Sequence, residues 1–367
     1  MERRTIALIV ALVLIAGAII ALEPLSPNKS YTGTAVAPGN RSAINAVKAQ
    51  MYPYAKEIAE PSGFINVDNI TIGSLIGKDV ILVDFWTYSC INCVRTIPYL
   101  NTWYAKYHDE GLEIIGVHTP EFQFEHNIEN VREAVQKYGI QYPVVLDNND
   151  ATWSSYGNLY WPEDYLIDID GFIVYRHIGE GDYDTIEREI QGLLRERAEA
   201  LGIQVSIANT TGVPANAIPV NFSEVGSPET YFGAAKNTYL GNGRPSVAGP
   251  QTLSLPATIH LNGLYLAGTW NFMDQYAETV GNASVIYEYD AKNVYLVASA
   301  ANATPVGVLL DGKPVPAADA GADLAGSVVT VGDERLYTLI QGTDYGEHTL
   351  ELDVGEPGFR AYTFTFG

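Results

Sequence analysis

The sequence predicts an α/β domain followed by an all-β domain, and three observations lead to that prediction. Residues 80–83 form an apolar, β-branched run, as expected of a strand buried on both faces. From Ile97 to Tyr107 apolar side chains recur at spacings of three and four, the period of a helix. Beyond residue 222 short alternating strands are separated by Gly, Asn and Asp turns, which is typical of a β-sandwich, here expected as a jelly roll.

Length and charge set the domain organisation and exclude some partners. The chain has 367 residues, which suits two folded domains and a tether better than one domain. We expect the α/β domain over residues 61–203, a linker over 204–221 and the β-sandwich over 222–367. The net charge of −22 argues against binding of nucleic acid or anionic lipid.

The N-terminal segment is expected to be a membrane anchor. Residues 5–22 form an apolar run of 18 residues after a basic start, so residues 1–22 are predicted to be a signal anchor; a cleaved signal peptide is the alternative. The arginines before the run place that end in the cytoplasm and both domains outside the cell membrane. If the segment is cleaved, the protein is secreted. Residues 23–60 are expected to be a stalk, with a helix over 46–59.

The remaining elements of the first domain follow from periodicity and turn signals. Asp170-Gly171 is a strong hairpin turn between two apolar runs. The expected strands cover residues 64–67, 80–83, 112–117, 143–146, 165–168 and 172–178, and the expected helices cover 124–138 and 184–201 as well as the helix after residue 90. This count is consistent with helices on both faces of a mixed sheet.

A C-x-x-C motif lies where the predicted central strand meets the following helix. Cys90 would sit at the helix N-terminus, where unpaired N–H groups and the macrodipole stabilise a thiolate. Cys93 lies one turn further on, close enough to form a disulfide. A zinc site would need two more ligands, and a structural disulfide closing so short a loop would stabilise little. The motif therefore predicts a redox-active pair, with Cys90 as nucleophile and Cys93 as resolving thiol, and no metal or other cofactor.

Around these cysteines the sequence resembles the thioredoxin superfamily, in particular its membrane-tethered TlpA/ResA-like branch. Asp84 matches the buried acid that exchanges protons with the second cysteine, and Pro98 matches the proline that kinks the active-site helix. Since Cys93 must lose its proton in an apolar site, a buried carboxylate of raised pKa is a suitable acceptor. The alternative for Asp84 is a strand residue hydrogen-bonded to a neighbour.

The resemblance also implies residues around the substrate. Glu121 matches an acidic residue near the disulfide of ResA-like proteins, although a lone glutamate on a loop is nearly as often a solvated surface group. Pro162 matches a cis-proline which, if cis, leaves the preceding backbone groups available to an extended substrate. Trp86, Tyr88 and Trp161 would form an apolar rim, although aromatic residues beside a strand are more often core.

Several longer motifs resemble the C-terminal periplasmic half of DipZ-type proteins. They are WTYSCINC and the segments 116–122, 160–162, 179–184 and 227–233, within a resemblance that runs from about residue 53 to the end. In that family a thioredoxin-like domain precedes a domain with a carbohydrate-binding-module fold. DipZ proteins begin with a CcdA-like electron-transporting membrane domain, which this sequence does not match. We therefore expect a separate CcdA-like membrane protein as electron donor.

The direction of electron flow is expected to be reductive. Strong oxidants stabilise their reduced form with extra charge near the thiolate, whereas Ile91 and Asn92 between the cysteines supply none. The predicted function is a membrane-anchored, extracytoplasmic thiol–disulfide oxidoreductase that acts on disulfide-containing proteins.

Two other functions compete with this prediction. Thr87 and Cys90 satisfy the T-x-x-C of peroxiredoxins, but Val83 stands where those enzymes have proline. The second alternative is a surface module that binds glycans or a protein, with a subsidiary redox domain. Its candidate sugar-stacking residues are Tyr231 and Trp270, although each is more often a core residue, and the carbohydrate label rests on fold resemblance alone.

Overall fold

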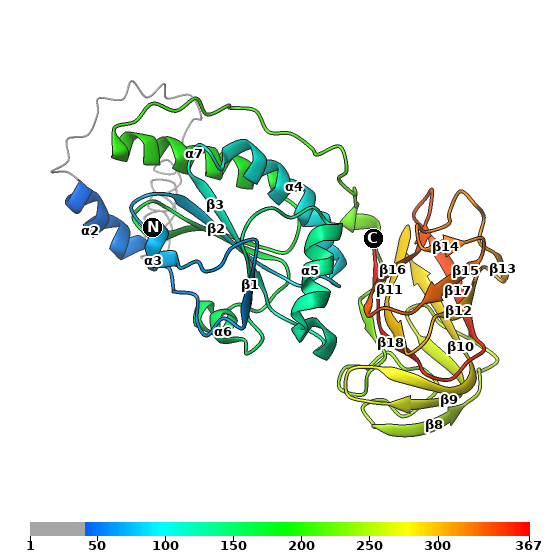
Figure 1. The fold of residues 1–367 in the computed structure, drawn as a ribbon. Coiled ribbons are helices and arrows are strands. Elements are labelled where there is room, and N and C mark those ends of the chain that lie inside the picture. Colours follow the sequence, from blue (N-terminus) through cyan, green and yellow to red (C-terminus); the bar gives the residue numbers. More distant parts are fainter. Residues whose placement is uncertain (1–40) are drawn as a thin grey trace, which may run out of the picture. The chain divides into compact units, whose positions relative to one another are not determined.

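The computed structural model describes residues 41–367 (Figure 1). The signal anchor predicted for residues 1–22 and the first part of the predicted stalk lie outside these residues. Over the described part of the chain, no helix has both the length and the apolar character needed to cross a membrane. We call residues 41–201 the α/β domain and residues 222–367 the β domain; residues 202–221 connect them without a helix or strand.

A six-stranded mixed sheet forms the centre of the α/β domain, in the order β1-β4-β3-β2-β5-β6. Strands β2, β3 and β4 are parallel, while β1, β5 and β6 run antiparallel to their neighbours. The bounds are β1 (Gly63–Ile65), β2 (Val80–Trp86), β3 (Leu112–His118), β4 (Val144–Leu146), β5 (Glu163–Ile167) and β6 (Ile173–Ile178). Every residue of β2 is buried, as the apolar run predicted, and the hairpin around Asp170-Gly171 is confirmed.

Helices cover both faces of this sheet (Figure 1). They are α3 (Ile72–Leu75), α4 (Ile91–Tyr107), α5 (Ile128–Lys137), α6 (Ala151–Tyr156) and α7 (Tyr183–Leu201). Because side chains alternate along a strand, Leu82 packs with α4, α5 and α7, and Val83 packs with α3 and α6. Asp84 is in phase with Leu82, so its side chain points to the α4 face, where the cysteines lie.

Helix α2 begins earlier than the sequence predicted. It spans Arg41–Met51, whereas a helix was expected over residues 46–59. Its Lys48 ammonium lies 2.6 Å from a carboxylate oxygen of Asp168 and 3.5 Å from one of Asp170, in the β5–β6 turn. Such ion pairs between distant segments cannot be read from the polar composition of residues 41–45, which suggested a stalk.

The β domain is a large antiparallel β structure, which confirms the predicted all-β sandwich. Its strands are β7 (Thr230–Tyr231), β8 (Gly249–Leu253), β9 (Leu264–Phe272), β10 (Ala277–Asp290), β11 (Asn293–Ala300), β12 (Thr304–Leu310), β13 (Lys313–Pro314), β14 (Leu324–Ala325), β15 (Val328–Val331), β16 (Arg335–Gln341), β17 (Glu347–Val354) and β18 (Phe359–Phe366). Strand β10 joins the layers, because it pairs with β18 near its start and with β17 over residues 283–290. A register shift between Thr279 and Ala283 bends it, as strands do where they change sheets.

Aromatic side chains pack the two domains together directly. Phe122 and Phe124 follow β3, and the short 3₁₀ helix η2 (Gln123–His126) holds the second of them. Their rings lie 5.2 and 5.0 Å from the ring of Tyr362 on β18, both edge to face. All three side chains are buried, so this contact removes a large apolar area from water and fixes the β domain near the end of β3.

Candidate active site at the Cys90–Cys93 pair

Cys90 caps the N-terminus of helix α4. Its Sγ accepts the backbone N–H of Cys93 at 3.4 Å, in the place where a serine or aspartate oxygen usually caps a helix. The side chain is half-buried, and both cysteines are thiols. The buried strand β2 therefore delivers Cys90 to a position where backbone donors can stabilise a negative sulfur and a substrate can still reach it.

Cys93 lies in the first turn of α4 and is almost completely buried. Burial raises the pKa of its thiol well above the ordinary value, and interactions with Cys90 and the charge of Asp84 raise this pKa further. A thiol in this position keeps its proton unless a nearby group accepts it.

Two aspartates lie side by side beneath this thiol. Asp84 on β2 is directly opposite Asp164 on β5, and both are buried. The two carboxyl groups are within hydrogen-bonding reach, and each has one oxygen without a partner among the described residues. Burial raises the pKa of Asp164 to about 7, and the charge of Glu163 contributes to this increase. Burial raises the pKa of Asp84 more strongly, because the charge of Asp164 adds to the effect. Two such groups in an apolar site cannot both ionise easily, so they share protons.

Glu121 lies beside the cysteines, but its partners come from the β domain. One carboxylate oxygen accepts the Tyr231 hydroxyl at 2.7 Å and lies 2.8 Å from Lys236 Nζ. The same hydroxyl lies 2.8 Å from a carboxylate oxygen of Glu229. The Glu121 side chain is only 11% exposed, so it is not the solvated loop residue considered as an alternative above.

A cavity of about 290 Å³ opens at Cys90 between these groups. Both domains line it. The lining residues are Cys90, Ile91, Asn92, Arg95, Glu121 and Trp161 from the α/β domain and Phe222, Val225, Ser227, Glu229, Tyr231, Lys236, Thr365 and Phe366 from the β domain. The contribution of the second domain was not predicted from the sequence.

Of the three predicted rim aromatics, Trp161 alone lines this cavity. Its carbonyl oxygen lies 3.8 Å from Cys90 Sγ, and the Trp161–Pro162 bond is cis, as the resemblance implied. Trp86 is fully buried, because it is the last residue of a strand covered on both faces. The hydroxyl of Tyr88 points away to the β domain, where it donates to the carbonyl of Glu334.

The predicted sugar-stacking pair does not form a platform. Trp270 has no exposed surface, and its indole N–H donates to the carbonyl of Ala267 inside the β domain. That prediction is wrong, because a buried ring on β9 cannot stack on a sugar. Tyr231 is half-buried and lies in the Cys90 cavity instead.

Two buried charged groups that hold the active-site turn were missed. Glu125 accepts the hydroxyl of Ser89 at 2.6 Å and the backbone N–H groups of Glu121 and Phe122 at 2.7 and 2.9 Å. It thereby ties the residue before Cys90 to the loop after β3. In the sequence it is one acidic residue among several on a surface-like segment, and nothing there marks it as buried.

Arg95 fixes the other side of the turn. Its guanidinium contacts both oxygens of Glu180, at 2.8 Å from Nε and 2.7 Å from Nη2, and also donates to the Asn92 side chain at 2.9 Å. Both partners of the ion pair are almost completely buried. Arginine at this point of a helix gives no sequence signal of burial.

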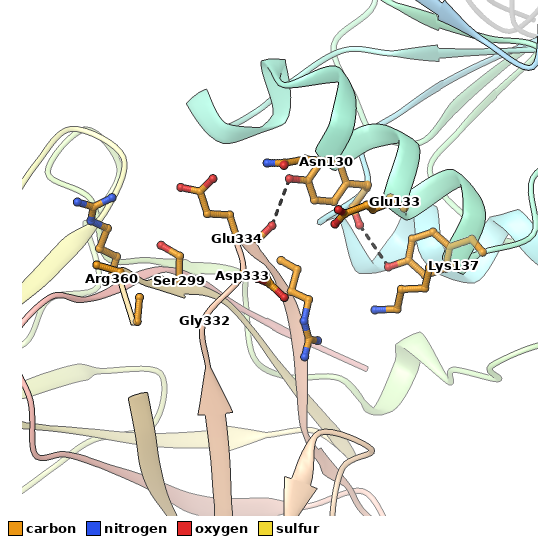
Figure 2. Close-up of a pocket in the computed structure, with 14 residues that line it drawn as sticks. Asn130, Glu133, Lys137, Ser299, Gly332, Asp333, Glu334 and Arg360 are labelled. Carbon is orange, nitrogen blue, oxygen red and sulfur yellow. Dashed lines mark hydrogen bonds between the residues drawn. The ribbon is translucent and has the colours of Figure 1, made fainter. Parts of the chain in front are cut away.

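A second cavity, of about 390 Å³, is lined by Tyr88, by residues of α5 and by residues 332–335 of the β domain (Figure 2). Figure 2 shows Asn130, Glu133 and Lys137 of α5 facing Asp333 and Glu334 of the β domain. The Tyr88 hydroxyl, which also lines this cavity, donates to the Glu334 carbonyl at 3.2 Å. No cysteine lines this cavity, whereas Cys90 lines the first one.

The fold and the site together define a thioredoxin-type protein that carries a C-x-x-C motif at the N-terminus of α4. Family models agree: residues 66–192 match the family described as Redoxin, and residues 227–367 match the one described as Thioredoxin like C-terminal domain. The chain thus contains a thioredoxin-like domain of the Redoxin type followed by a thioredoxin-like C-terminal domain.

Two curated relatives give a closer comparison. Protein DipZ of Mycobacterium bovis is 36% identical over 319 residues, which are 85% of this chain and 43% of DipZ. Thiol-disulfide oxidoreductase ResA of Bacillus anthracis is 35% identical over 118 residues, 32% of this chain and 65% of ResA. The chain thus spans less than half the length of DipZ. Among solved structures, a putative thiol:disulfide interchange protein DsbE from Chlorobium tepidum is 23% identical, with a TM-score of 0.35, over 39% of this chain and 96% of its own.

Proposed function

We propose that this protein is a thiol–disulfide oxidoreductase of the reductant or isomerase type, acting on protein disulfides. One observation carries the proposal: a half-buried Cys90 at a helix N-terminus lies above a buried Cys93 and a pair of buried carboxyl groups. This arrangement separates an attacking thiol from a resolving one.

The reaction follows from these positions. The Cys90 thiolate attacks one sulfur of a substrate disulfide, which breaks the S–S bond, forms a mixed disulfide and releases one substrate thiolate. Cys93 then gives its proton to the carboxyl pair and attacks Cys90 Sγ. The second substrate thiolate leaves and is protonated. The substrate has gained two electrons, and Cys90 and Cys93 are joined in a disulfide.

Asp84 and Asp164 act together in this scheme. When the pair holds one proton, its shared negative charge is the nearest base to the buried thiol, and it becomes neutral as it takes the Cys93 proton. Asp84 is the member whose charge reaches Cys93, and Asp164 sets how readily Asp84 ionises.

The reductive direction rests on the residues between the cysteines. Ile91 and Asn92 offer no charge to stabilise the thiolate form, as strong oxidants do. The reduction potential of the pair tests this. We expect a value near that of thioredoxin, about −270 mV, and a value near about −120 mV would reverse the direction.

Insulin reduction and hydrogen peroxide consumption separate the proposal from the peroxidase alternative. We expect the first activity and not the second. Peroxide turnover without insulin reduction would overturn the proposal.

We further propose that the protein works outside the cell membrane, held by residues 1–22, and is reduced by a CcdA-like membrane protein. The chain has two cysteines, both in the active site, so any electron relay through the membrane lies outside this sequence. Thiol alkylation in cells reads the redox state of the pair. It should become oxidised when CcdA-like donors are removed; a pair that stays reduced would exclude that donor.

A further inference from the structure

We propose that the β domain forms a fixed second wall of the substrate groove at Cys90. Tyr231 and Lys236 are its specificity-determining residues. The groove favours an extended cystine-containing strand with neutral or basic residues over a disulfide on the surface of a folded protein. This inference rests on the function proposed above and identifies the substrate class of the same site.

The first step is that Cys90 opens into a space made by both domains. Trp161 and Cys90 lie on one side of the cavity, and Tyr231, Lys236 and Phe366 lie on the other. A substrate sulfur that approaches Cys90 through this cavity therefore passes between the domains.

The second step is that contacts hold the wall in place on both sides of the active-site turn. Beside the cavity, Glu121 binds Tyr231 and Lys236, and the backbone N–H of Gln123 donates to the Gln275 side chain at 2.9 Å. At the second cavity, Tyr88 donates to the carbonyl of Glu334. The buried rings of Phe122, Phe124 and Tyr362 fill the space between them. Because separating the domains would expose these apolar rings to water, the contact favours a β domain that stays fixed beside Cys90 over one that moves away from it.

The third step is size. A cavity of about 290 Å³ is at the lower end of small-ligand sites, which span about 300–1,000 Å³. A folded partner typically covers about 800 Å² on each side of an interface, which this space cannot receive. A single extended strand fits, because it presents one or two side chains and a sulfur at a time.

The fourth step is charge. Among the described residues, the charged side chains that line the cavity are Glu121, Glu229, Lys236 and Arg95. Both cations are already paired with carboxylates, Lys236 with Glu121 and Arg95 with Glu180, which leaves Glu229 without a cation. In addition, the Tyr231 hydroxyl lies within hydrogen-bonding distance of both Glu121 and Glu229, and burial together with the charge of Glu121 raises the pKa of Glu229 to about 7. A positive group from the substrate would therefore stabilise this pair of carboxyl groups in its ionised form. Acidic residues beside the cystine would be repelled.

The test compares one disulfide in two settings. The same cystine-containing segment is offered to the reduced protein as a free peptide and as an exposed loop of a folded protein, and the oxidation rate of the Cys90–Cys93 pair is followed. We expect the wild type to prefer the free peptide by at least about tenfold. Tyr231→Ala with Lys236→Ala should remove most of that preference by speeding the reaction with the folded protein. An acidic version of the free peptide should react more slowly than the basic version.

Controls separate this inference from the function on which it rests. Tyr239→Ala with Lys313→Ala alters an exposed tyrosine and an exposed lysine of the same domain outside the cavity and should leave the preference intact. If the double wall variant does not fold, Lys236→Ala alone carries the test, because that side chain is 54% exposed. If the wild type and the Tyr231→Ala, Lys236→Ala variant prefer the free peptide equally, the proposal that the β domain determines specificity is wrong. Failure of the reduced pair to react with any disulfide, including a small aromatic one, overturns the proposed function instead.

Discussion

The two domains bury different kinds of polar side chain. In the α/β domain the buried acidic, arginine and histidine side chains are Asp84, Arg95, His118, Glu125, Asp147, Glu163, Asp164, Asp168 and Glu187. In the β domain the buried polar side chains are all neutral: Ser, Thr, Asn or Gln. Burying a charge costs several kcal/mol unless it is paired, and replacing such pairs with apolar groups often stabilises a protein. Several of these groups are paired, such as Asp168 with Lys48 and Glu187 with Lys106, but Asp84 and Asp164 form no salt bridge among the described residues. Their burial beside Cys93 is therefore better explained by chemistry than by stability.

His118 shows how burial in the α/β domain disfavours the charged form of a side chain. It is fully buried between Trp86 and Tyr88, and burial lowers its pKa to about 3. The ring is therefore neutral at physiological pH and packs as an aromatic group, with one nitrogen 3.4 Å from the Thr87 hydroxyl. Histidine beside a redox motif is not by itself evidence of a charged catalytic group.

The strongest test of the comparison removes one sulfur at a time. Cys93→Ser leaves Cys90 able to attack but removes the resolving thiol, so mixed disulfides with substrates should accumulate and turnover should stop. Cys90→Ser should trap nothing. Non-reducing electrophoresis after incubation with a disulfide substrate measures both. Equal trapping by the two variants would contradict the assigned roles.

A large effect on stability alone is expected from the β domain. Trp270→Ala removes a fully buried ring and should lower the free energy of unfolding by about 3–5 kcal/mol. The rate of Cys90 with a small disulfide should not change while the variant remains folded. Denaturant unfolding and that rate, measured on one sample, check the expectation. A rate loss in the folded variant would show that the β-domain core is linked to the chemistry.

Proton transfer should respond to either aspartate. Asp84→Asn removes the group whose charge reaches Cys93 and should slow resolution of the mixed disulfide by about a hundredfold. Asp164→Asn should have a smaller effect and shift the pH at which the rate rises. Rapid-mixing kinetics between pH 6 and 9 separate attack from resolution. Glu129→Gln, an exposed carboxylate on α5, is the matched control. An unchanged pH profile in both aspartate variants would leave the pair with a structural role only.

The same pair makes stability depend on pH. The pKa of Asp164 is raised from 3.8 to about 7, so between these values the folded chain holds a proton that the unfolded chain releases. Its contribution to stability is complete below about pH 4 and falls as pH rises, by up to about 1.4 kcal/mol per pH unit. In Asp164→Asn the part of this fall that comes from Asp164 should be absent, while the part that comes from Asp84, whose pKa burial also raises, should remain. Denaturant midpoints from pH 4 to 8 measure it, and parallel curves for wild type and variant would contradict the raised pKa.

The sequence predicted those parts of the site that depend on local order along the chain. Cys90, Cys93 and Asp84 stand at fixed distances on one strand and the helix after it, and these spacings survive folding. Asp164 was missed because it meets Asp84 only through the pairing of β2 with β5. Residues that stand opposite each other on two strands leave no pattern within either strand.

Contacts between the domains could not be predicted from the sequence either, because they also join residues that are far apart along the chain. Tyr231 could be recognised as an aromatic residue of a β domain, but not as a partner of Glu121, 110 residues earlier. Trp270 was misplaced because alternation along a strand does not say which face is covered when both faces of a β structure can be buried. The start of α2 was missed because its ion pairs reach Asp168, far along the chain.

The smallest expected effect concerns the ion pair between the domains. Lys236 is 54% exposed and Glu121 11% exposed, so their attraction is partly screened by water. Exposed pairs typically contribute about 0.2–1 kcal/mol, and Lys236→Met, which keeps most of the aliphatic chain, should lower the free energy of unfolding by no more than that. The loss should shrink further at 1 M salt, where the screening length is about 3 Å. Denaturant unfolding at low and high salt measures both, with Lys313→Met as the control on an exposed β-domain lysine.

Because the aromatic contact of Phe122 and Phe124 with Tyr362 remains, the domains should stay packed in this variant. A loss of several kcal/mol would mean that the ion pair, and not the aromatic contact, holds the wall at Cys90.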